Sequence, residues 1–158
     1  MKESEVISVV ERLLYKHDCI VLPGFGAFIG NYRSARFSVF GHKLYPPSKE
    51  ITFNPKLFKN DGLLVSEVAH EEEIPYDEAL SEITAFVKQL KHVLSEKDAS
   101  FSFGDVGKFV QEGDKVFFFQ NDASNYLLSS WGLRPLIVRP VIQSVPESDA
   151  AQVSAGNP

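Results

Sequence analysis

The sequence predicts an α+β protein built of two related units in tandem, each with helices packed on a small antiparallel three-stranded sheet. One observation is that amphipathic helical stretches alternate with short apolar runs that end at glycine or proline. The second is an internal sequence repeat. Residues 20–28 read Ile-Val-Leu-Pro-Gly-Phe-Gly-Ala-Phe, and residues 101–109 read Phe-Ser-Phe-Gly-Asp-Val-Gly-Lys-Phe, at an offset of 81.

The first unit, residues 1–59, is predicted to contain one helix and three strands. Valine and leucine residues at helical spacing predict an amphipathic helix over 3–16. Short apolar or alternating runs bounded by turn residues predict strands at 19–22, 27–31 and 50–53. The intervening segment 32–49 is rich in basic and aromatic residues and is predicted to leave the sheet as an arm.

The second unit, residues 60–140, is predicted to contain two helices followed by strands. Apolar spacing and helix-terminal residues predict the helices at 61–71 and 76–95. Strands are predicted at 100–104, 107–112, 115–120 and 135–139. Gly113-Asp114 suits a tight hairpin, so this unit has no arm. Residues 141–158 are expected to form a flexible tail or linker.

The internal repeat predicts equivalent turns in the two units. The offset places Gly26 on Gly107 and Phe28 on Phe109. Glycine permits a sharp strand-to-strand turn, and the aromatic residue two positions later closes the core beneath it. The residues expected to build these turns are Gly24, Phe25, Gly26, Phe28, Gly107 and Phe109.

Charge is divided unevenly along the chain. Residues 1–59 hold nine basic and five acidic side chains, whereas residues 60–130 hold five basic and fourteen acidic ones. The overall charge of −5 therefore hides a basic first unit that a polyanion would meet first. A single cysteine excludes an intramolecular disulfide framework. No apolar run is long enough for a membrane helix, and the start lacks a signal-peptide core, so we expect a cytoplasmic protein.

No pattern for catalysis or cofactor binding is found. Gly24-Phe25-Gly26 is followed by a strand rather than a helix, which excludes a dinucleotide fingerprint. The four histidines lack metal-ligand spacing, and Cys19 is expected to be a buried structural thiol. We therefore predict no enzyme activity, no cofactor, no metal and no small-molecule substrate.

The order of elements and three segments resemble the HU/IHF superfamily of bacterial DNA-binding proteins. The segments are Gly24-Phe25-Gly26-Ala27-Phe28, Asn31-Tyr32-Arg33-Ser34-Ala35-Arg36 and Pro46-Pro47-Ser48-Lys49-Glu50-Ile51. The fuller resemblance is to a tandem bacterial variant related to the HU-like domains of a eukaryotic centrosomal coiled-coil protein. Some members of that variant carry a downstream membrane helix and a peptidoglycan-binding SPOR domain, so this chain could be the cytoplasmic part of a membrane-anchored protein.

The resemblance implies a non-enzymatic architectural module whose partner is double-stranded DNA. HU-type arms reach around the minor groove and wedge a proline between base steps. The matching candidates here are Arg33, Arg36, His42, Lys43, Pro46, Pro47 and Lys49. Such a module could link the chromosome to cell-division or envelope machinery.

A second interpretation is a scaffold of HU fold that no longer binds DNA. The arm carries more apolar side chains than a solvated ribbon needs, including Phe37, Phe40 and Tyr45. These groups could contact DNA bases, the body of the protein or a partner protein. The resemblance also implies that HU-like surfaces pair, either within this chain as a pseudo-dimer or between chains by self-association.

Overall fold

The computed structural model describes residues 2–130 and 132–138. In the first unit, helix α1 (Glu3–Lys16) precedes an antiparallel sheet with the strand order β1-β2-β5. These strands are β1 (Cys19–Leu22), β2 (Gly26–Arg33) and β5 (Ser48–Asn54). The buried face of α1 carries the predicted valines and leucines, while Glu3 and Glu5 lie in its first turn, where they complement the helix dipole.

The second unit contains two helices and an antiparallel sheet with the strand order β6-β7-β8. The elements are α2 (Leu63–Glu71), α3 (Tyr76–Val93), β6 (Ser100–Phe103), β7 (Gly107–Glu112) and β8 (Lys115–Gln120). The α+β prediction is confirmed, and the boundaries of most elements agree with the expected ones within two residues. The expected tail, 141–158, lies outside the described residues.

The internal repeat is visible in the strand register. Ile20 pairs with Phe28 and Leu22 with Gly26, and the same pairs recur 81 residues later as Phe101 with Phe109 and Phe103 with Gly107. A Cβ atom on Gly26 would lie 2.9 Å from the carbonyl oxygen of Asn54, and one on Gly107 would overlap that of Phe119. Both turns therefore need glycine for the close approach of a neighbouring strand.

The two units pack against each other with reciprocal aromatic contacts. Phe28 lies opposite Phe53 in the first sheet, and Phe109 lies opposite Phe118 in the second. Across the units, Phe53 meets Phe109 at a ring-centroid distance of 4.9 Å, and Phe28 meets Phe118 at 5.3 Å, both edge-on. Phe28 is equivalent to Phe109, and Phe53 is equivalent to Phe118. The two contacts are therefore the same contact made once in each direction, as at an isologous dimer interface. The units thus form a pseudo-dimer within one chain.

A single hydrophobic core serves both units. It joins α1 and the first sheet to α2, α3 and the second sheet through residues such as Leu14, Phe28, Leu64, Ile83 and Phe103. Helix α2 packs against α3 of its own unit and also against α1 and β1 of the first. Within the described part of the chain, no helix is long and apolar enough to span a membrane.

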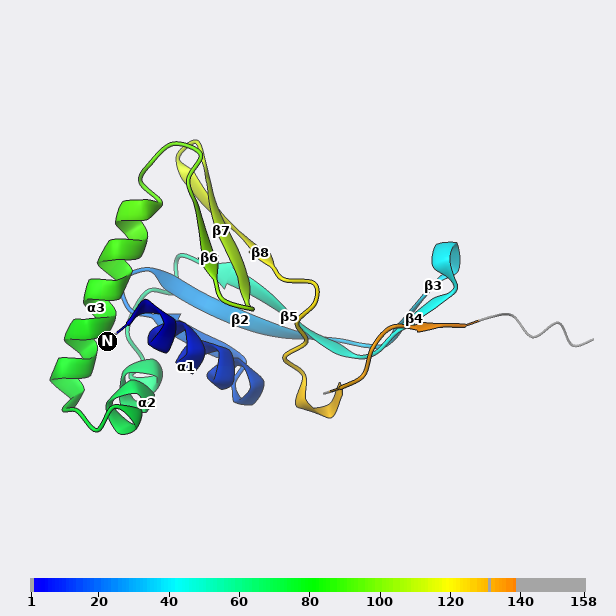
Figure 1. The fold of residues 1–158 in the computed structure, drawn as a ribbon, viewed down its shortest axis with the longest axis horizontal. Helices are drawn as coiled ribbons and strands as arrows, with labels where there is room; N and C mark the ends of the chain where they lie inside the picture. Colours follow the sequence, from blue (N-terminus) through cyan, green and yellow to red (C-terminus); the bar gives the residue numbers. More distant parts are fainter. Residues whose placement is uncertain (1, 131, 139–158) are drawn as a thin grey trace, which may run out of the picture.

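The arm leaves the body between β2 and β5 (Figure 1). It consists of β3 (Arg36–Ser38), a short 3₁₀ turn η1 (Val39–Gly41) and β4 (Lys43–Tyr45). A third strand, β9 (Leu136–Ile137), comes from the end of the second unit and pairs antiparallel with β4. The arm projects away from the three helices, which lie at the opposite end of the molecule (Figure 1).

Candidate nucleic-acid interface

The arm presents different side chains on its two faces. Arg36 pairs with Tyr45 in the strand register, and Lys43 pairs with Ser38 and Ile137. Phe37, Leu44 and Leu136 are aligned in the intervening row. Because successive side chains of a strand point to opposite faces, the cations and this apolar row lie on opposite sides of the ribbon. Lys43, Arg36 and His42 are exposed.

Pro46 and Pro47, the candidates for a proline that wedges between base steps, lie at the base of the arm and not at its tip. The tip is formed by η1 and by His42, which has a left-handed backbone with φ of 47°. Pro46 and Pro47 instead separate β4 from β5, where the arm joins the main sheet. Proline lacks the N–H that a strand ladder requires, so two consecutive prolines interrupt pairing at this junction.

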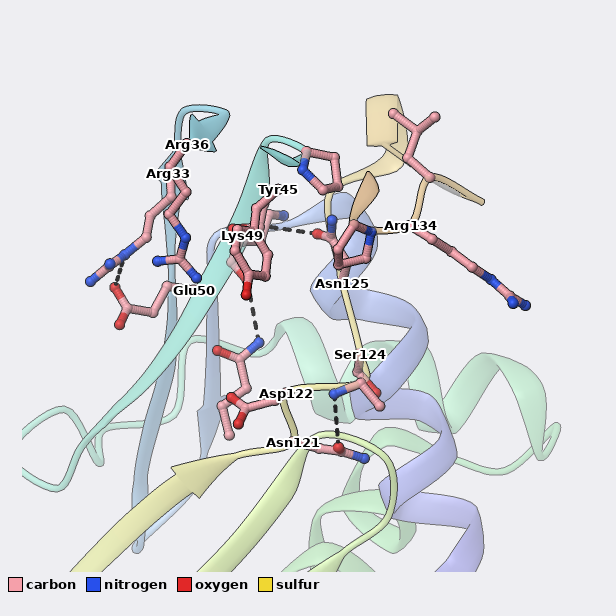
Figure 2. A pocket seen from close by; sticks show the side chains of 16 residues that line it. Arg33, Arg36, Tyr45, Lys49, Glu50, Asn121, Asp122, Ser124, Asn125 and Arg134 are labelled. Carbon is pink, nitrogen blue, oxygen red and sulfur yellow. Dashed lines mark hydrogen bonds and ion pairs between the residues drawn. The ribbon is translucent and has the colours of Figure 1, made fainter. Parts of the chain in front are cut away.

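A cleft of about 660 Å³ lies at the base of the arm. Its lining includes three arginines: Arg33 on β2 and Arg36 on β3, which are three residues apart, and Arg134, which precedes β9 about 100 residues later in the sequence. Figure 2 shows Arg33 and Arg36 together on the arm side and Arg134 on the other side, with its side chain directed away from them. Two carboxylates, Glu50 and Asp122, also line the cleft and offset part of this positive charge.

Two of these arginines are held by neighbours. The Arg33 Nε donates to Glu50 Oε2 at 2.6 Å, and both side chains are partly exposed. The Arg36 guanidinium lies 5.1 Å from the centre of the Tyr45 ring in a cation–π contact. Arg36 and Lys43 have no ion pair among the described residues, so their charges are available to an anion.

Lys49 is placed differently from the expectation that it would face DNA. Its side chain is only 7% exposed, and its ammonium donates to the carbonyl oxygen of Leu14 at 2.8 Å. Asp18 Oδ1 lies 3.1 Å from the same nitrogen. The register puts Lys49 on the core-facing side of β5, where it caps the last carbonyls of α1 instead of pointing to solvent.

Arg134 was not among the residues proposed from the sequence. The sequence did predict a strand over 135–139, but nothing in the local pattern indicated that it would pair with the arm. The connection before it is anchored by Asn125, whose side-chain amide donates to the Pro47 carbonyl at 3.0 Å. Its Oδ1 accepts from the Lys49 N–H at 3.3 Å, which fixes this segment beside the base of the arm.

The acidic side chains of the second unit are concentrated away from the arm. Seven of its fourteen acidic residues fall between Glu67 and Glu82, on α2, α3 and their connection. Figure 1 places these helices at the end of the molecule opposite β3 and β4. A phosphate at the arm is therefore separated from much of the negative charge, whose effect is screened beyond about 8–10 Å at physiological salt.

Two titratable groups outside the arm are perturbed. Burial, together with Glu11 and Tyr15, raises the pKa of the Tyr126 phenol, whose ring packs 4.9 Å from that of Tyr15.

Cys19 is exposed at the start of β1, contrary to the expected buried thiol, because the first position of that strand faces outward. Partial desolvation and the nearby Asp61 raise its pKa. Among the described residues, no group of three or more His, Cys, Asp and Glu side chains could hold a metal ion.

Comparison with family models covers most of the chain. Residues 3–61 match the family described as CCDC81-like prokaryotic HU domain 1, and residues 62–131 match CCDC81-like prokaryotic HU domain 2. The predicted resemblance to a tandem bacterial HU variant is thereby confirmed. No curated protein matches the chain, and no solved structure does.

Proposed function

Because the chain belongs to the CCDC81-like prokaryotic HU proteins through both of its domains, we propose that it is a non-enzymatic architectural module that binds duplex DNA with its single arm. The observation that carries this proposal is that three arginines, Arg33, Arg36 and Arg134, line one cleft at the base of the arm. Guanidinium groups suit phosphate because they donate several hydrogen bonds in a fixed plane.

Three exposed cations form the proposed contact surface. Arg36 and Lys43 lie on the charged face of the arm, and Arg134 lies across the cleft. Arg33 is engaged by Glu50 and contributes less, and the buried Lys49 contributes to stability rather than to binding.

This surface predicts weak binding that depends on salt and not on sequence. Neutralising three phosphates gives a slope of about −2.7 for log affinity against log salt, so binding falls roughly 40-fold between 50 and 200 mM. Fluorescence anisotropy with a labelled duplex of about 30 base pairs measures this slope. The triple variant Arg36→Glu, Lys43→Glu, Arg134→Glu is expected to abolish binding at 50 mM salt.

A matched control separates local contact from net charge. Lys88→Glu, Lys91→Glu and Lys97→Glu change the total charge by the same amount, but these exposed lysines lie on or just after α3, away from the arm. The control is expected to retain most of the binding. Equal losses in the two triple variants, or no binding by the unmodified chain at 50 mM salt, would contradict the proposal.

The second candidate function is a scaffold of HU fold that binds protein in place of DNA. The observation that favours it is the apolar side chains left exposed on the arm, with Phe37 at 52% and Phe40 fully accessible. A link between the chromosome and cell-division or envelope machinery needs both kinds of contact. A scaffold alone predicts no salt-dependent binding in the anisotropy titration.

A further inference from the structure

We propose that the apolar face of the arm is a contact surface for a second copy of this chain. We define this face by Phe37, Leu44 and Leu136, which the strand register aligns in one row across β3, β4 and β9. Their exposed fractions are 52%, 38% and 61%, although cross-strand neighbours already cover their flanks. A row of this kind in a monomer commonly marks an interaction site.

The distribution of charge on the arm favours a second copy over a charged partner. Phe37, Leu44 and Leu136 carry no charge that would attract an acidic or basic surface. The cations Arg36 and Lys43 lie on the opposite face, so two arms packed through their apolar rows keep these groups apart. An uncharged row is complementary to itself, which is what an isologous contact between identical chains requires.

The position of the arm also permits this contact. The body already closes its aromatic core within the chain, so the two units do not need a partner there. The arm projects beyond the helices and both main sheets (Figure 1). Two arms could therefore meet without a collision between the bodies, and β9 would belong to the contact because Leu136 completes the row.

The available area predicts a weak association. With the tip residues Val39 and Phe40 added, five exposed apolar side chains offer about 500 Å² per copy, on the scale of 150–250 Å² for a fully buried aromatic side chain. The total of roughly 1,000 Å² is at the lower limit for a specific interface. We therefore expect a dimer that forms at about 10 µM or above and dissociates on dilution.

Cysteine cross-linking on the full chain tests which face is in contact. In a Cys19→Ser background, Leu44→Cys places a thiol on the apolar face, and Lys43→Cys places one at the adjacent position on the charged face. Under mild oxidation at about 50 µM, Leu44→Cys is expected to form a disulfide-linked dimer at least about tenfold faster than Lys43→Cys. Equal rates, or no dimer from Leu44→Cys, would overturn the proposal.

Sedimentation velocity across a concentration series provides the second measurement. The double variant Phe37→Ser, Leu136→Ser is expected to remain monomeric where the unmodified chain dimerises. Phe117→Ser, Phe119→Ser is the matched control, because these phenylalanines are exposed to a similar extent on β8. A dimer that survives the arm substitutions, or an unmodified chain that stays monomeric throughout, would refute the contact. The Arg36→Glu, Lys43→Glu, Arg134→Glu variant should still dimerise, so failure of DNA binding would leave this result intact.

Discussion

Lys49 illustrates how burial changes the role of a charged side chain. The sequence places it in a basic arm, but the structure surrounds it with the C-terminal carbonyls of α1, Asp18 and Gly30. A Cβ atom on Gly30 would lie 2.7 Å from the Lys49 side chain, so the glycine provides the space through which the lysine passes. A register-dependent inward orientation cannot be read from a local run of basic residues.

The first prediction concerns this lysine. Lys49→Met should lower the free energy of unfolding by about 1–3 kcal/mol, because the Leu14 carbonyl loses a charged donor in a buried place. Lys43→Met, on the exposed charged face, should change it by no more than about 0.5 kcal/mol. Urea unfolding measures both. Weaker DNA binding by folded Lys49→Met at unchanged stability would show that the ammonium contacts phosphate after all.

The second prediction concerns Tyr126, which is 2% exposed. Its pKa is raised above the ordinary value of 10.0 chiefly by burial, so the folded state favours the neutral phenol. The resulting stability is complete below pH 10 and is lost as the pH rises beyond it, because the unfolded chain releases its proton first. Tyr126→Phe keeps the ring and removes the titration. The free energy of unfolding, measured from pH 8 to pH 11, should therefore fall more steeply for the unmodified chain than for Tyr126→Phe. Parallel curves for the two proteins would contradict this expectation.

At the scale of elements, local pattern predicted most of the secondary structure. The helices at 3–16 and 61–71 and the hairpin around Gly113-Asp114 follow from apolar spacing and turn residues, which are properties of neighbouring positions. The pairing of β9 with β4 joins segments about ninety residues apart. No local signal specifies it, and the position of Arg134 in the cleft depends on it.

The third prediction tests whether the arm is separable from the body. None of residues 34–47 is buried, so the core does not depend on them. The cross-strand pair Asn31–Glu50 corresponds to Glu112–Lys115, the pair that flanks the turn of the hairpin in the second unit. Arg33–Ser48 lies two residues further along the same two strands, so this pair has the same hydrogen-bonding pattern as Asn31–Glu50. Replacing 34–47 by Gly-Asp should therefore close a hairpin like that at Gly113-Asp114 while retaining Lys49.

The arm-replaced chain is expected to unfold with a free energy within about 1 kcal/mol of the unmodified chain. It should lose both salt-dependent DNA binding and dimer formation. Calorimetry or urea unfolding checks the first expectation, and anisotropy and sedimentation check the others. A chain that fails to fold would show that the arm supports the body, and full DNA binding without the arm would place the contact elsewhere.

At the scale of the whole molecule, the internal repeat predicted that the two units have related folds but not how they pack against each other. The offset of 81 was readable from glycine and phenylalanine positions, and it left open pairing within one chain or between chains. The reciprocal contacts Phe53–Phe109 and Phe28–Phe118 resolve this in favour of pairing within the chain. Such contacts depend on tertiary packing, which equivalent residues alone do not determine.

The fourth prediction follows from the shared core. Because aromatic and aliphatic residues of both units fill one cluster, residues 1–61 and 62–138 should each be largely unfolded when produced alone. The full chain should unfold in one cooperative transition. Circular dichroism and amide chemical-shift dispersion of each fragment provide the measurement, and a fragment with native-like dispersion by itself would contradict a shared core.

Binding of duplex DNA by the arm is tested by a nuclear magnetic resonance titration of the full chain with a short duplex at 50 mM salt. We expect changes in amide chemical shift to be concentrated at Arg36, Lys43 and Arg134 and at the tip of the arm, while the shifts of α2 and α3 remain unchanged. Shifts centred on the helices, or a spectrum unaffected by an excess of duplex, would contradict binding by the arm.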